Sequence, residues 1–516
     1  MNFELNTKKF EQIQTNINCD EYKYTINLIV YNADWITYDL NKFISITGEI
    51  TYSTRDLNGT LLISNPVKEI NEKAFYECKN LNSVIIGNSI ISINIDAFKG
   101  CKNLTSVIIG NSIKIINENA FYMCSNLNSL IIDDNNPNYY SDGNILFNKD
   151  KSKLILSYNK SLTEYTIPNS VISINKNAFK NCFKLNSVII PNSVKTINKY
   201  AFCNCYKLSS ITIQDSVKKI GKNAFSGCKN LTSVIIGNSV EIIGKNAFCN
   251  CYKLNSVIIG NSVKIIGENA FSGCKTLTSV IIGNSVISIG DFVFSDCNNL
   301  NSLIIDNNNP KYSIDNNILF NKDKSKLISS YNKSLTEYII PDSVKTIGQY
   351  AFSKCNNLTS ITIPDSVISI GTYAFEDCFN LTSVTIPDSV ISFGNHIFSG
   401  CKNLKSIIIP DSIISISYCA FEYCSNLSSI IIPDSVEIIS DYAFSGCKNL
   451  ASITIGNSET LIGEGAFSNC PNLKTITILY SFNEQFYDNT IIIDRSRFIK
   501  AAPDSKITFI YKQYME

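Results

Sequence analysis

A repeat of 23 residues constrains the fold of this chain more than any other feature of its sequence. An Ala-Phe pair, followed by Cys three residues after the Phe, occurs fifteen times, and only Val293 and Ile397 replace the Ala. The residues that mark the copies are Phe75, Phe98, Phe121, Phe179, Phe202, Phe225, Phe248, Phe271, Phe294, Phe352, Phe375, Phe398, Phe421, Phe444 and Phe467. A unit this short cannot bury its own apolar side chains, whereas stacked units bury them against each other. The sequence therefore predicts a solenoid of stacked coils.

Each copy predicts one strand and one compact turn. The run Leu-Thr-Ser-Val-Ile-Ile at 277–282 alternates apolar side chains at its end, which is typical of a short strand. Gly283 here, and Pro364 in a later copy, ends the strand. The apolar residues of 266–274 recur at helical spacing. The predicted fold is an α/β-type repeat array with a parallel β-sheet on one face and short helical or 3₁₀ turns on the other.

Two longer coils, near 133–167 and 306–340, interrupt the regular copies. Each keeps the strand but replaces the Ala-Phe-Cys turn by two apolar runs around a polar turn, at 145–155 and 318–328. This pattern predicts a β-hairpin in each longer coil. Residues 60–479 then form the array, and residues 1–59 and 480–516, which break the pattern, are expected to be its N-terminal and C-terminal caps.

The repeat resembles a known family. Residues 364–386 carry the pattern Pro-x-Ser-Val-x-x-Ile-Gly-x-x-Ala-Phe-x-x-Cys-x-x-Leu-x-x-Val-x-Ile, which is similar to the leucine-rich repeat of the BspA-like proteins. The resemblance implies a right-handed leucine-rich-repeat solenoid used for recognition. It also implies an adhesin of the cell surface whose partner is a protein, such as a host extracellular-matrix or receptor protein, or a glycan.

Charge and hydropathy limit the other partners. The 45 Lys and Arg residues balance 44 Asp and Glu residues, so no net field attracts nucleic acid, and we expect none to bind. No apolar run is long enough to predict an integral membrane segment. Neither a signal peptide nor an anchor is visible, so the sequence leaves a surface and a cytoplasmic location open, and it leaves the oligomeric state open.

Cysteine and histidine, the residues most often used for chemistry, follow the repeat here. Fifteen of the nineteen Cys are the Cys of the repeat and are predicted to be buried free thiols. The pairs 203/205 and 249/251 lack a second pair to complete a zinc site, so no metal and no cofactor are expected. His396, the single His, occupies the repeat position of Tyr350 and Tyr373, which indicates packing. We therefore expect no catalytic residues and no enzymatic activity.

The outward column of the strands is the candidate partner-binding face. We call it the strand-face column; its members are Ile108, Ile131, Ile189, Thr212, Ile235, Ile258, Ile281, Ile304, Thr362, Thr385, Ile408 and Ile431. A contiguous apolar surface of this kind often marks a partner site. The simpler explanation is that Ile and Thr are there because they favour strands. A neighbouring column of Ser residues receives Glu164 and Glu337 in the longer coils.

The hairpin tips are the second candidate contact. Their charged residues are Lys151, Lys153, Lys324 and Lys326. The simpler explanation for them is a solvated turn. The leading hypothesis is a non-enzymatic recognition or adhesion protein, and the alternative is an intracellular leucine-rich-repeat scaffold or regulatory module.

Overall fold

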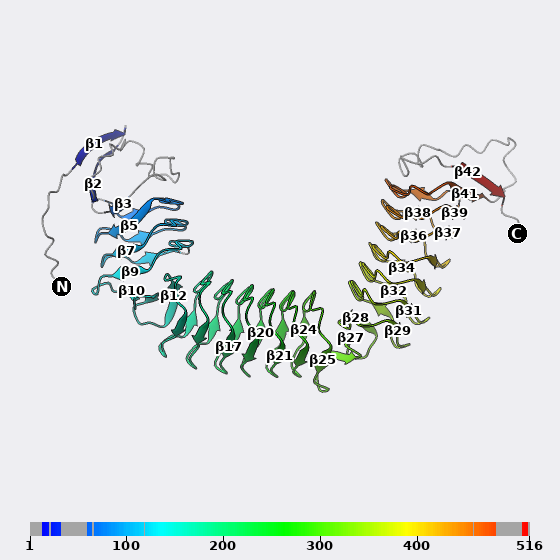
Figure 1. Cartoon of the computed structure of the whole chain (residues 1–516), viewed down its shortest axis with the longest axis horizontal. Helices are drawn as coiled ribbons and strands as arrows, with labels where there is room; N and C mark the ends of the chain where they lie inside the picture. The colour runs from blue at the N-terminus through cyan, green and yellow to red at the C-terminus, as the bar shows by residue number, and fades with distance from the viewer. Residues whose placement is uncertain are drawn as a thin grey trace. The chain divides into compact units, whose positions relative to one another are not determined.

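The computed structural model describes residues 13–19, 22–31, 59–63, 67–117, 119–457, 459–480 and 508–513 (Figure 1). The chain forms two compact units. The first comprises Met1–Leu277 with Ser288–Cys297, and the second comprises Thr278–Ile287 with Asn298–Glu516. Within each unit, successive coils lie side by side and contribute their strands to the same sheets (Figure 1).

In the first unit each regular coil has two strands, a longer main strand and a second strand of two residues. The main strands are β5 (Leu81–Ile86), β7 (Ser106–Ile109), β9 (Ser129–Ile132), β13 (Glu164–Thr166), β15 (Ser187–Ile189), β17 (Ser210–Ile213), β19 (Ser233–Ile236) and β21 (Ser256–Ile259). The second strands are β4 (Glu69–Ile70), β6 (Ser92–Ile93), β8 (Ile115–Ile116), β14 (Ser173–Ile174), β16 (Thr196–Ile197), β18 (Lys219–Ile220), β20 (Ile242–Ile243), β22 (Ile265–Ile266) and β24 (Ser288–Ile289).

The second unit repeats this arrangement. Its main strands are β23 (Ser279–Ile282), β25 (Ser302–Ile305), β29 (Glu337–Ile339), β31 (Ser360–Thr362), β33 (Ser383–Thr385), β35 (Ser406–Ile408), β37 (Ser429–Ile432), β39 (Ser452–Ile455) and β41 (Thr475–Tyr480). Its second strands are β30 (Thr346–Ile347), β32 (Ser369–Ile370), β34 (Ser392–Phe393), β36 (Ser415–Ile416), β38 (Ile438–Ile439) and β40 (Leu461–Ile462).

The strands pair in parallel with a shift of one repeat, so each residue lies beside its own copy. In β17 and β19, for example, Ile211 pairs with Val234 and Thr212 pairs with Ile235. The first pair is buried and the second is exposed, because successive side chains of a strand point to opposite faces. The predicted leucine-rich-repeat solenoid with a parallel sheet is confirmed.

Columns of like side chains run through the interior of each unit, with Phe and Cys beside Leu, Val, Ile and Ala. The Phe rings stack on one another: the ring centroids of Phe202 and Phe225 are 5.1 Å apart, with planes inclined by 3°. The Cys column runs beside them, and its thiols donate to the Phe carbonyl of the preceding coil, as Cys228 does to Phe202 over 3.3 Å. All fifteen repeat cysteines are buried, so the core is a stack of like residues on like residues.

The expected helical or 3₁₀ turns are wrong. The described residues contain no helix, and the segment around each Phe is a run of overlapping β-turns. Asn223 and Gly227, two residues before and after Phe225, have φ angles of 54° and 75°. A left-handed residue at every fourth position interrupts a right-handed helix. In return the amides of 223, 225 and 227 donate to carbonyls of the next coil at 2.7–2.9 Å, which ties the coils together.

The predicted hairpins are confirmed, with one strand more than expected in each. In the first unit β11 (Ile145–Asn148) pairs antiparallel with β12 (Lys153–Ser157), and β10 (Tyr139–Ser141) adds to β11. In the second unit β26 (Tyr312–Asp315), β27 (Ile318–Asn321) and β28 (Lys326–Ser330) repeat this arrangement. Strands β12 and β28 pair in parallel with β14 and β30, so each hairpin continues the ladder of second strands.

The expected caps lie largely outside the described residues. Of the N-terminal segment, β1 (Ile13–Cys19) pairs antiparallel with β2 (Tyr22–Tyr31), which pairs antiparallel with β3 (Gly59–Ile63). Of the C-terminal segment, β42 (Thr508–Gln513) pairs in parallel with β41. Nowhere in the part of the chain that the structure describes is a helix long and apolar enough to cross a membrane.

Candidate functional site

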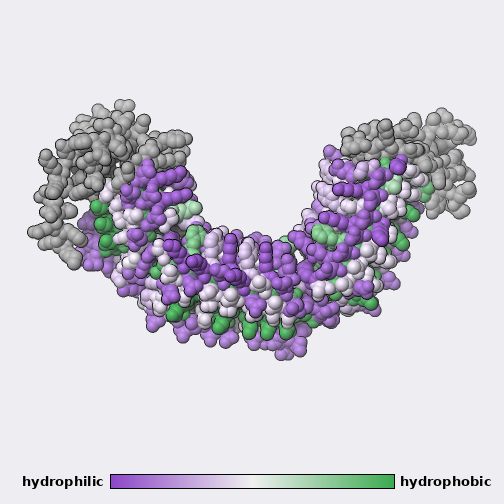
Figure 2. All heavy atoms as spheres, in the orientation of Figure 1, coloured by the Kyte–Doolittle hydropathy of each residue, from purple (hydrophilic) through white to green (hydrophobic). Residues whose placement is uncertain are grey.

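The strand-face column is exposed in both units. In the first unit Ile235 and Ile258 are neighbours across β19 and β21, and 64% and 63% of their surfaces are exposed. In the second unit Thr385 pairs with Ile408, whose exposed fraction of 73% is the highest among the Ile of the predicted column. Figure 2 shows hydrophobic residues recurring in a row near β17 and β21, with polar residues around them. The main strands therefore present apolar side chains to solvent.

The longer coils add members to this face that the sequence did not predict. Glu164 pairs with Ser187 and Glu337 pairs with Ser360, as their place in the Ser column predicted, and both Glu side chains are exposed. Two residues further along, Ile339 continues the strand-face column and is 74% exposed. The strand residues of the longer coils have the same spacing as those of the regular coils, and this spacing could have predicted Ile339 as a member.

Exposed apolar residues also lie on or beside the short second strands, at two adjacent repeat positions where other coils carry charged residues such as Lys195, Lys218 and Glu241. They are Ile91, Ile115, Ile172, Ile265, Ile287, Ile368, Ile391, Ile414, Ile438 and Leu461. None of these residues was among the predicted contact residues. A shallow pocket of about 320 Å³ opens beside them in the second unit, between Tyr418, Asp441 and Leu461.

The lysines of the hairpin tips have partners within their own hairpins. Lys151 Nζ lies 3.8 Å from the centre of the Tyr140 ring. Lys324 Nζ forms an ion pair of 3.0 Å with Asp315. Lys153 and Lys326 lie on β12 and β28 and are exposed. The tips thus differ in their local contacts although their sequences are alike.

The thiols of the repeat are packing groups. The eighteen cysteines whose side chains the structure describes are free, and all but Cys249 are buried. Burial raises the pKa of most column thiols well above its usual value, and it raises that of Cys470 to about 11. Cys101 is the exception, because hydrogen bonds with Cys124 and next with Cys78 lower the pKa of its thiol. The buried column thiols donate to backbone carbonyls of the preceding coil, as those of Cys228 and Cys251 do, which is the arrangement of packing groups.

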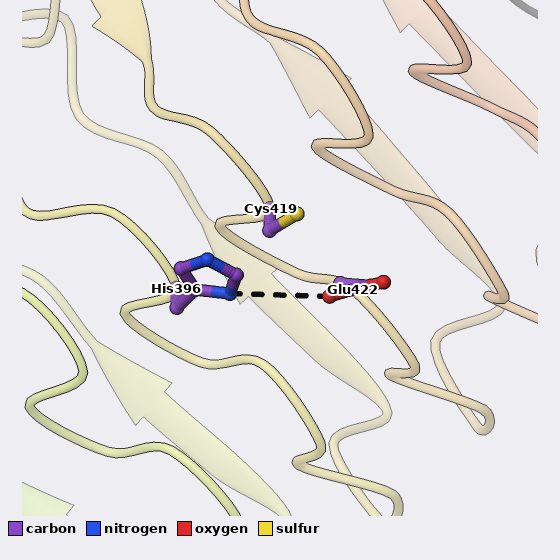
Figure 3. A group of neighbouring side chains, drawn as sticks. All are labelled: His396, Cys419 and Glu422. Carbon is purple, nitrogen blue, oxygen red and sulfur yellow. Dashed lines mark ion pairs between the residues drawn. The ribbon is translucent and has the colours of Figure 1, made fainter. Parts of the chain in front are cut away.

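One group of side chains departs from the repeat and does bring donor atoms together. His396, Cys419 and Glu422 come from two successive coils of the second unit, and their ligand atoms all lie within 4.8 Å of one another (Figure 3). His396 Nδ1 is 3.9 Å from Glu422 Oε2. Burial, and next the negative charge of Glu422, raises the pKa of the Cys419 thiol to about 12. His396 was predicted to be a packing residue, and its approach to Cys419 and Glu422 was not predicted.

The family model decides what these coils are. The model of the BspA type leucine rich repeat region matches residues 47–151, 155–275, 241–330, 328–424 and 369–492. The chain belongs to the BspA-type leucine-rich-repeat family. The predicted resemblance is thereby confirmed, and it covers both units of this BspA-type chain.

A solved structure of another repeat protein shows the same fold. The BspA-type chain is similar to a leucine-rich repeat protein from Eubacterium ventriosum, with 24% identity over 67% of this chain and 96% of that chain, and a TM-score of 0.52. It also resembles a leucine-rich repeat protein from Bacteroides ovatus, with 24% identity over 84% and 92% of the two chains, and a TM-score of 0.45. Among curated proteins none matches.

Proposed function

We propose that this BspA-type array is a non-enzymatic recognition protein that binds a protein partner through its strand-face column. The observation that carries the proposal is the adjacent pair Ile235 and Ile258, each more than three-fifths exposed and repeated by like residues in neighbouring coils. Burial of apolar surface contributes about 25 cal/mol per Å², so a row of such side chains supplies binding energy as a partner covers it. In this proposal the array at residues 60–479 binds the partner. The segments 1–59 and 480–516 act as its N-terminal and C-terminal caps.

Flat rows of Ile and Thr suit a protein better than a small molecule. Small ligands bind in concave pockets, whereas a strand face offers breadth with little depth. The strand-face column carries no charge, and the 45 basic residues of the chain are balanced by 44 acidic residues. The protein therefore has no net charge that would attract a polyanionic partner. By family resemblance the partner is a host matrix or receptor protein, and the chain acts as a surface adhesin.

The test places a charge on the column without disturbing the fold. Ile235→Lys and Ile258→Lys change exposed side chains, so we expect the stability to change by less than about 0.5 kcal/mol. Binding of the purified chain to immobilised extracellular-matrix proteins should fall at least about tenfold, because a charge is desolvated in the complex. The matched control is Ile172→Lys, which charges a residue that is 51% exposed beside β14, at a repeat position where the next coil carries Lys195.

Equal loss of binding in the control would show that the column has no special role. Location is tested separately by labelling or protease treatment of the surface of intact source cells. An adhesin is cleaved or labelled under these conditions. A chain that is fully protected would instead be an intracellular scaffold, the alternative that the sequence left open.

A further inference from the structure

The cluster combines two donors that are rare in the repeat, His396 and Cys419, with Glu422, whose repeat position carries Glu in one other coil, at Glu376. His396 is the only His among 516 residues, and Cys419 is one of four cysteines outside the repeat column. Both occupy the position two residues before the repeat Phe, where the neighbouring coils carry Tyr373 and Tyr442. The change from Tyr to His and Cys in two successive coils places both donors on the same side of the stack.

The backbone holds these positions in place. His396 and Cys419 have φ angles of 53° and 52°, a left-handed conformation that costs residues other than Gly about 1–2 kcal/mol. The amide of His396 donates to the carbonyl of Tyr418 over 2.9 Å, and that of Cys419 donates to Asp441 over 3.2 Å. Each donor is therefore fixed to the next coil by a backbone hydrogen bond.

The imidazole ring is also oriented by its neighbours. It stacks on Tyr373 at 4.6 Å between centroids and contacts the edge of Tyr418 at 5.2 Å. Its Nδ1 is thereby directed to Glu422, as Figure 3 shows. Cys419 is 3% exposed, while about a fifth of the side-chain surface of His396 and of Glu422 is exposed. The cluster thus has a buried side and a side open to water.

From this geometry we propose that His396, Cys419 and Glu422 form a binding site for a zinc-class divalent transition-metal ion. Imidazole, thiolate and carboxylate are the three ligand types that zinc takes in proteins, at about 2.0–2.3 Å. Donors on one tetrahedral ion lie about 3.3–3.8 Å apart at those bond lengths. The separation of 3.9 Å between Nδ1 and Oε2 is close to this value, and the ligand atoms of all three side chains lie within 4.8 Å of one another, so a bound ion would draw the outermost pair closer together.

Charge supports the same ion. The thiolate and the carboxylate carry two negative charges that balance a divalent cation, and the imidazole binds neutral. Within the described residues Glu422 forms its ion pair with His396. No Lys or Arg of this part of the chain therefore competes with a metal ion for the Glu422 carboxylate. On binding, the thiol proton passes to the buffer and Sγ forms a bond to the metal. The ion clips two coils together, and three protein ligands leave its fourth position to water or to a group of a partner.

The repeat itself supplies variants that preserve the fold. His396→Tyr restores the residue of the preceding coil, and Glu422→Ser restores the residue of the next coil, Ser445. Cys419→Ser removes the thiol. The matched control is Glu376→Ser, because Glu376 occupies the position of Glu422 two coils earlier, where it accepts from Ser353 over 3.1 Å and belongs to no cluster of ligand atoms among the described residues.

The experiment titrates the full chain with Co²⁺ and then displaces it with Zn²⁺. We expect one ion per chain, with the near-ultraviolet absorption of a cobalt–thiolate bond. Each of the three variants should weaken binding by at least about 10- to 100-fold, the loss that even an outer-shell partner causes. Glu376→Ser should bind as the unchanged chain does. Absence of the absorption in the unchanged chain, or its persistence in both Cys419→Ser and His396→Tyr, would overturn the proposal.

Discussion

Lys160 Nζ lies 3.5 Å from the Sγ atom of Cys182. The same ammonium group donates to the carbonyls of Ser157 and Lys180 over 2.7 and 3.1 Å. In the regular coils the repeat thiol donates to the Phe carbonyl of the preceding coil, but the longer coil has no such Phe. At this break in the column the sulfur atom of Cys182 instead accepts from Lys160, so the direction of the hydrogen bond is reversed. Lys333 does the same in the second unit, where its Nζ lies 3.8 Å from Cys355.

Replacing Lys160 by Met should destabilise the chain. The apolar stem is kept, but two carbonyls lose their donor, at a cost of about 1–3 kcal/mol for each group left unsatisfied in the interior. The midpoint of urea unfolding should fall, and Cys182 should react faster with an alkylating reagent. The control is Lys184→Met, at an exposed position of the coil that contains Cys182. It should leave the urea midpoint and the reactivity of Cys182 unchanged. An equal effect of the two variants would contradict the role given to Lys160.

The Phe stack should be costly to interrupt. Phe248 is fully buried, with the rings of Phe225 and Phe271 each 5.2 Å from its own. We expect Phe248→Ala to lower the free energy of unfolding by about 3–5 kcal/mol. Phe183, which is 45% exposed on the surface, serves as the comparison. Its replacement by Ala should cost about 1 kcal/mol, as measured by denaturant unfolding.

Alkaline pH should destabilise the array. Most column thiols, such as Cys251, Cys401 and Cys424, have a pKa raised by burial in the folded chain, and that of Cys470 is about 11, whereas an unfolded thiol titrates near 8.5. Their contribution to stability is complete below about pH 8.5 and is lost as pH rises through the folded pKa. For each such thiol we expect the free energy of unfolding to fall by up to about 1.4 kcal/mol per pH unit between about pH 8.5 and the folded pKa. Urea midpoints at several pH values check this, and a midpoint that is constant up to pH 10 would contradict it.

A left-handed position occupied by Met should allow a stabilising change. Met123 has a φ angle of 63° and is 49% exposed, while the same repeat position carries Asn in other coils, such as Asn181 and Asn204. Asn tolerates this conformation better, so Met123→Asn should raise the stability by about 0.5–1 kcal/mol. Gly273→Ala should instead lower the stability. The φ angle of Gly273 is 73°, and a Cβ at this position would lie 2.4 Å from Asn250 Oδ1. Thermal unfolding of both variants gives the comparison.

Much of the fold could be predicted because it depends on the identity of residues 23 positions apart. The strand at 277–282, the buried Phe and Cys columns and the two hairpins all follow from that period and from the alternation of apolar residues. The turn could not be assigned from apolar spacing, since 266–274 has helical spacing without helical backbone angles. The residue types at 269 and 273, Asn and Gly, accept positive φ angles and could have indicated a turn instead of a helix.

The sequence by itself determined the array, the in-register stacking and the exposure of the strand-face column, because a strict period places every residue beside its own copy. Tertiary structure decided the features that depend on contacts between different residues of adjacent coils. These are the left-handed turns with their hydrogen bonds to the next coil, the lysines at the breaks in the thiol column, and the approach of His396 to Cys419 and Glu422. Such contacts depend on backbone angles and side-chain direction, which the period alone does not specify.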